Sequence, residues 1–108
     1  MTPEERLRDD MRHFPTLLNR WAGGTAKVVE LTTSHATLII RILHPQKHGS
    51  LELHLQPPPR YFRGPFNWPN CSINISLGHD LIFIIRDTNA DVEIHAEYIS
   101  IQEKAQLF

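Results

Sequence analysis

Glu93, His95 and Glu97 are of residue types that could carry acid–base chemistry. They alternate with other residues, so in a strand all three point to the same face, where a carboxylate and an imidazole could exchange protons. Residues two apart are separated by ~6.6 Å along a strand, however, which is beyond direct hydrogen bonding for most rotamers. Arg86 stands opposite Glu93 in the register that we prefer. We therefore expect an ordinary cross-strand ion pair and no catalytic residues.

His44, His48 and His54 could suggest a metal cluster. In the expected hairpin, His44 and His54 lie on opposite faces and on the order of 16 Å apart, which is too far for ligands of one ion. His44 and His48 could still meet across the turn, but solvated surface histidines are the favoured interpretation. Cys71 is the only cysteine, so it forms neither a paired zinc motif nor an intrachain disulfide. We expect no metal and no cofactor.

Residues 56–70 differ in kind from the rest of the chain, because they combine five prolines with four aromatic side chains. The three successive prolines favour an extended backbone, and the aromatic residues argue against a free linker. We expect a long ordered loop across the sheet. Tyr61, Arg63 and Trp68 are its candidate ligand-binding residues, for a small-ligand-binding protein or an enzyme with a pocket beneath the loop.

A second candidate surface is a polar sheet face that includes two isoleucines. Apolar positions rimmed by polar ones are typical of interaction surfaces. The amino-terminal helix or the loop could instead cover these isoleucines within the molecule. The candidate interface residues are Ile82, Ile84, Glu93, His95 and Glu97.

These residues depend on two hairpins within 72–101. The apolar run Leu81–Ile85 predicts a strand covered on both faces. The predicted register of the first hairpin is Leu77 opposite Leu81, Ile75 opposite Phe83 and Ile73 opposite Ile85. That of the second is Ile85 opposite Ile94 and Phe83 opposite Ala96. After Ala96 the apolar residues move from even to odd positions. This change predicts a β-bulge near Glu97 or Tyr98, or else places Ile99 and Ile101 on the second face of the sheet.

The first half of the chain predicts strands over 25–33, 37–43 and 51–55. Pairing Leu38 with Leu55 and Ile40 with Leu53 makes one apolar face, and the same register places Arg41 opposite Glu52. We expect a turn at 34–35. We find no internal repeat.

An amphipathic helix is predicted before these strands. Thr2 and Glu5 form a capping box around Pro3, and Gly23 with Gly24 ends the helix. Pro15 predicts a kink near Arg12 or a break into two helices. The apolar stripe that should face the sheet consists of Leu7, Met11, Phe14, Leu18 and Trp21.

Composition sets the remaining expectations. The 108 residues suit one domain over 1–108, and a formal net charge of −1 argues against nucleic acid as a partner. Charged residues near the amino terminus and the lack of a long apolar run predict a cytoplasmic protein without a membrane segment.

The expected fold is α+β: an amino-terminal helix on a largely meandering antiparallel sheet of about six strands, with a Pro/aromatic-rich loop at 56–70. The expected function is that of a small non-enzymatic interaction module that binds a protein partner or itself.

Overall fold

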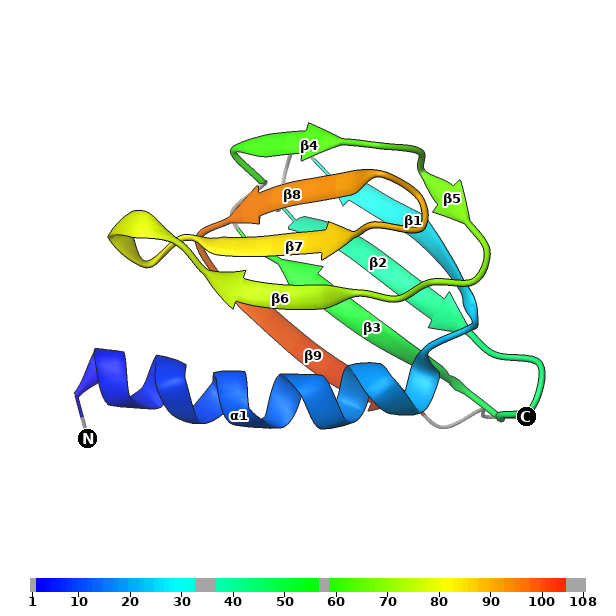
Figure 1. The fold of residues 1–108 in the computed structure, drawn as a ribbon, viewed down its shortest axis with the longest axis horizontal. Coiled ribbons are helices and arrows are strands. Elements are labelled where there is room, and N and C mark those ends of the chain that lie inside the picture. The colour runs from blue at the N-terminus through cyan, green and yellow to red at the C-terminus, as the bar shows by residue number, and fades with distance from the viewer. Residues whose placement is uncertain (1, 33–36, 57–58, 105–108) are drawn as a thin grey trace.

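Two antiparallel sheets and an amino-terminal helix form the fold in a computed structural model, which describes residues 2–32, 37–56 and 59–104 (Figure 1). The α+β class, with the helix packed against antiparallel sheet, is therefore confirmed. The described residues form nine strands in two sheets, where we expected about six strands in one. The predicted turn at 34–35 and part of the predicted loop lie outside the described residues.

The five-stranded sheet has the strand order β5-β1-β2-β3-β9. Its strands are β1 (Thr25–Thr32), β2 (Thr37–Leu43), β3 (Ser50–Leu55), β5 (Asn67–Trp68) and β9 (Ile99–Lys104). The four-stranded sheet has the order β4-β8-β7-β6. Its strands are β4 (Tyr61–Arg63), β6 (Asn74–Leu77), β7 (Phe83–Asp87) and β8 (Val92–Ala96). The short strands β4 and β5 lie in the segment that we expected to be a loop.

Each sheet is built on a three-stranded meander, and the short strand β5, which follows β4, returns to the first sheet to pair with β1. Strands β1, β2 and β3 form a meander, and β4 then crosses to the other sheet to pair with β8. Strands β6, β7 and β8 form a second meander, and β9 crosses back to pair with β3. The two crossings touch, since the amide of Gln56 donates to the carbonyl of Tyr98 (3.3 Å) and that of Arg60 donates to the carbonyl of His95 (2.8 Å). Each meander is thus completed by the fourth strand of the other.

The second crossing explains the change of apolar parity near Glu97. The chain neither forms a bulge here nor places Ile99 on the second face of the same sheet. Strand β8 ends at Ala96, and β9 begins at Ile99 in the other sheet. Ile99 pairs with Leu55, and its side chain is buried in the core. A bulge and a transfer between sheets leave the same mark in the sequence, because both shift a two-residue period by one.

The core lies between the two sheets, and the helix α1 (Pro3–Trp21) runs along one side of them (Figure 1). The ring centroids of Phe14 and Phe83 are 6.3 Å apart, and Phe83 is buried. The inward-facing strand residues that are buried include Leu38, Ile40, Ile42, Leu51, Leu53, Leu55, Ile75, Ile85, Val92, Ile94 and Ala96. Burial of this two-sided apolar layer is the main stabilising term of the fold.

The helix begins and ends as its sequence predicts. Thr2 and Glu5 form the capping box, with the Glu5 amide donating to the Thr2 hydroxyl at 3.1 Å. Beyond the helix, Gly24 lies so close to the Leu43 carbonyl that a Cβ would come within 2.4 Å of that oxygen. The predicted break at Pro15 is wrong, since α1 continues through it. Phe14 and Leu18 are buried on either side of Pro15, and this packing offsets the missing backbone hydrogen bond.

Most of the predicted registers are confirmed. Strand β2 pairs with β3 as expected, including Arg41 opposite Glu52, and β7 pairs with β8 through Ile85 and Ile94. The register of β6 with β7 is wrong by two residues, because Leu77 pairs with Phe83 instead of Leu81.

The loop between β6 and β7 is the cause of that shift. Asp80 and Leu81 have positive φ values (57° and 58°) within a short 3₁₀ helix (His79–Leu81), and Leu81 is exposed instead of paired. A shift of two residues keeps every side chain on its predicted face.

A buried carboxylate joins the segment after β5 to the β7–β8 hairpin. Asp87 is 1 % exposed and accepts hydrogen bonds from the Trp68 indole (2.8 Å) and from the backbone amides of Ser72 (2.7 Å) and Asn89 (2.9 Å). Three donors on one carboxylate replace the water that it loses on burial. This contact ties the end of β5 and the segment before β6 to the end of β7.

We expect Asp87→Ala to lower the free energy of unfolding by about 3 kcal/mol, because it leaves three donors without their acceptor. Urea denaturation followed by tryptophan fluorescence measures this change. Asp91→Asn is the control, since that exposed carboxylate contacts only Arg63 among the described residues and asparagine tolerates the positive φ of this position (52°), so it should cost less than about 0.5 kcal/mol. Equal losses in the two variants would contradict the structural role of Asp87.

The described residues include no helix long and apolar enough to cross a membrane.

Candidate functional site

The outward side of the four-stranded sheet, here called the outer face, brings together residues from both predicted sites. Two cross-strand rows define it. One row contains Arg63, Glu93, Arg86 and Asn74, and the next contains Tyr61, His95, Ile84 and Ser76. Tyr61 and Arg63, predicted to bind a ligand, therefore stand beside Ile84, Glu93 and His95, predicted to form an interface.

Three of the predicted residues lie elsewhere. Trp68 belongs to the five-stranded sheet, is buried, and donates its indole N–H to Asp87. Ile82 is half-buried at the end of the 3₁₀ helix, before β7 begins. Glu97 follows β8 and forms an ion pair with Arg60 in the other crossing. Trp68 is therefore part of the core, and Glu97 belongs to the contact between the crossings.

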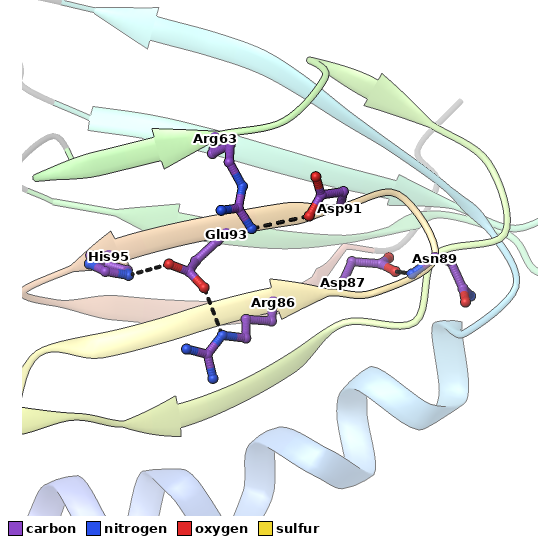
Figure 2. Close-up of polar contacts among 7 residues, drawn as sticks. All are labelled: Arg63, Arg86, Asp87, Asn89, Asp91, Glu93 and His95. Atoms are coloured by element: carbon purple, nitrogen blue, oxygen red, sulfur yellow. Dashed lines mark hydrogen bonds and ion pairs between the residues drawn. The ribbon is translucent and has the colours of Figure 1, made fainter.

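Glu93 is the centre of the outer face (Figure 2). One carboxylate oxygen accepts a hydrogen bond from Nε of Arg86 at 2.9 Å, and the other lies 3.0 Å from Nε2 of His95. The Glu93–Arg86 pair is the cross-strand contact that the sequence predicts. The expectation that Glu93 and His95 are too far apart is wrong, because both side chains lean along the strand toward one another.

These contacts set the charge state of Glu93. The hydrogen bond from Arg86 holds the pKa of the Glu93 carboxyl below its ordinary value, and the one with His95 lowers it further. Arg63, opposite Glu93 on β4, adds a smaller electrostatic contribution in the same direction. Glu93 is therefore ionised near neutral pH, and the row around it carries two basic groups and one acidic group.

Aromatic and basic side chains surround this centre. The ring centroids of Tyr61 and His95 are 4.9 Å apart at an interplanar angle of 37°, and Tyr61 is exposed. Arg63 reaches Asp91 with Nη2 at 3.1 Å (Figure 2). Arg86 bonds Glu93 through Nε, and its side chain is 53 % exposed, so its terminal N–H groups face solvent. The outer face can therefore donate hydrogen bonds to an acidic group beside an aromatic surface.

The remaining sequence candidates have local roles. His44 accepts a hydrogen bond at Nδ1 from the Gln46 amide within its own turn. The pKa of the Cys71 thiol is raised, first by burial and then by the nearby Asp87 carboxylate, so it is a poor nucleophile. A groove lies between α1 and β6, lined by Phe14, Pro15, Leu18, Asn19, Ile73, Asn74 and Ile75, and shares only Asn74 with the outer face.

The structure reveals a second constellation, of which the sequence predicts the Arg41–Glu52 pair but not the added contact with His54. On the outward side of the five-stranded sheet, the Glu52 carboxylate accepts a hydrogen bond from Nε of Arg41 at 3.0 Å and lies 2.9 Å from Nε2 of His54. Burial would raise the pKa of Glu52, but the hydrogen bonds from His54 and Arg41 outweigh it, so the pKa is lowered.

A sequence signal for this second constellation exists. The pattern apolar-Glu-apolar-His-apolar occurs at 51–55 and again at 92–96, each time after an Ile-Ile-Arg segment. This short shared pattern is the signal that could have revealed the second constellation.

We expect the lowered pKa of Glu52 to make stability depend on pH. The carboxyl titrates lower in the folded chain than in the unfolded chain, where its ordinary value is 4.5. The stabilisation is thus complete above pH 4.5 and is lost as the pH falls through the lower folded pKa. Urea denaturation at a series of pH values should show a steeper acid loss in the wild type than in Glu52→Gln. Parallel pH profiles would contradict this assignment.

Comparison with known proteins gives no lead to the function of these residues. No family model, curated protein or solved structure matches the chain. The two outward sheet surfaces are therefore the remaining guide to the function.

Proposed function

We propose that the protein is a non-enzymatic interaction module that binds an acidic segment of a partner protein on the outer face of the four-stranded sheet. The observation that carries the proposal is the exposed guanidinium of Arg86 on the same face of the sheet as Tyr61 and Ile84. The inward side of the same sheet is committed to the core, so the outer face is the surface of this sheet that a partner can reach.

The residue types support a protein partner. Tyrosine and arginine are enriched among residues that dominate binding energy, because they combine large contact area with directional hydrogen bonds. Tyr61 and Arg63 come from the edge strand β4, and Arg86 and Ile84 come from β7, two strands away. These residues lie on paired strands, so their backbone is already ordered before a partner binds. This lowers the entropy cost of binding.

The charges support an acidic segment. Glu93 already has two partners, so the terminal N–H groups of Arg86 are left to bind carboxylates from outside. Arg63 is half exposed and can exchange its exposed partner Asp91 for such a carboxylate. Arginine binds carboxylates through two parallel hydrogen bonds, which fixes the orientation of the ligand. Ile84 and the Tyr61 ring add apolar surface in the row next to these donors. The best occupant is therefore a segment that combines Asp or Glu with an apolar side chain.

Selection of phage-displayed random peptides on the immobilised full chain tests this proposal. We expect the enriched peptides to combine acidic residues with a large apolar residue. Fluorescence anisotropy with one such synthetic peptide should show about tenfold weaker binding for Arg63→Ala, because loss of an arginine that binds the ligand is worth about 1–2 kcal/mol.

Arg20→Ala is the matched control. Arg20 also forms a surface ion pair, with Glu103, and is similarly exposed, but it lies on the helix. This variant should bind like the wild type. Selection of basic or uncharged peptides, selection of none, or equal effects of the two substitutions would overturn the proposal.

A further inference from the structure

The two constellations of Arg, Glu and His occupy equivalent places in the fold. Arg41 lies on β2 and Arg86 on β7, the middle strands of the two meanders. Glu52 with His54 and Glu93 with His95 lie on the third strands, β3 and β8. Both sets point outward, so they lie on opposite sides of the layered structure.

Their geometry matches as closely as their positions. The distance from the arginine Nε to the glutamate carboxylate is 3.0 Å in the first set and 2.9 Å in the second. The distance from the histidine Nε2 to the other oxygen is 2.9 Å and 3.0 Å. The arginine side chains are 44 % and 53 % exposed, but Arg41 binds Glu52 through Nη2 as well as Nε (2.9 Å and 3.0 Å), so it has fewer terminal N–H groups left for a ligand than Arg86.

Neighbouring residues give the two rows the same number of charges in a different order, because Lys27 takes the place of Asn74 and Gln102 that of Arg63. Lys27 on β1 stands beside Arg41 and is exposed, so the first row also carries two basic groups and one acidic group. Ile39 lies opposite His54 as Ile84 lies opposite His95. The features that select an acidic, partly apolar segment on the outer face therefore occur twice.

We propose that the outward side of the five-stranded sheet, around Lys27, Arg41 and His54, is a second site for the same kind of acidic segment. The inference rests on the proposed function and makes each chain bivalent. A bivalent module can join two segments of one partner, or two partner molecules, with an avidity above that of either site.

The second site is the weaker one. Where β4 contributes Tyr61 and Arg63 to the outer face, β9 contributes Ser100 and Gln102 to the equivalent positions. Serine lacks the aromatic surface of tyrosine, and glutamine lacks the charge of arginine. We therefore expect affinities that differ by about tenfold or more.

Isothermal titration of the full chain with the synthetic acidic peptide tests the inference. The expected result is two peptides bound per chain, in a tight and a weak class. Lys27→Ala should weaken the weak class alone and Arg63→Ala the tight class alone. Both substitutions leave the arginine–glutamate contacts of Arg41 and Arg86 in place, so folding is preserved.

Backbone amide chemical shifts provide a second measurement. Saturating peptide should move the signals of His54 and Ser100 as well as those of His95 and Ser76. One bound peptide, with no effect of Lys27→Ala and no shifts at His54 and Ser100, would overturn the second site and leave the proposed function standing. Absence of binding at both faces would instead overturn the proposed function.

Discussion

Neither three-stranded meander can bury its apolar side alone, and this constraint shapes the whole molecule. Each sheet has one strongly apolar side, and each supplies the cover for the other. The exchange of fourth strands makes the arrangement mutual, because β9 extends the first meander and β4 extends the second. The helix adds Phe14, Leu18 and Trp21 to the side of the core that the sheets leave open (Figure 1).

The outward surfaces follow from the same constraint. A strand that directs Leu51, Leu53 and Leu55 into the core must direct Glu52 and His54 outward. Each glutamate is then stabilised by an arginine across the strand and a histidine along it. Glu52 and Glu93 are only 9 % and 19 % exposed, yet remain ionised near neutral pH because these partners compensate for lost water. The surfaces are consequently rigid and carry well-defined hydrogen-bond donors.

Local patterns in the sequence predict much of this structure. The capping box at Thr2, the strands around Ile40 and Leu53, and the pairing of Ile85 with Ile94 all depend on residues close in the chain, and all are confirmed. The division into two sheets was not predictable in this way. It depends on where the chain leaves a sheet, and the parity change at Glu97 also fits a bulge within one sheet.

The candidate site was predictable only in part. The sequence places Glu93 and Arg86 opposite one another, but it cannot show that Tyr61 from β4 stacks on His95, since that pairing joins distant segments. Trp68 was selected for its residue type, and burial against Asp87 removes it from the surface. The repeated Glu-x-His pattern was visible in the sequence, but alternation in strands is so common that only the shared geometry gives the pattern meaning.

The crossed strands also govern how the chain must fold. Strand β3 pairs with β9, which is the last strand of the chain. Contacts between such distant segments give the fold a high contact order, so folding is expected to be slow. Neither half holds a complete sheet by itself, which couples both halves into one cooperative unfolding unit. A polypeptide cut between β5 and β6 would therefore give two fragments that acquire structure only by associating, which is the behaviour sought in split-protein reporters.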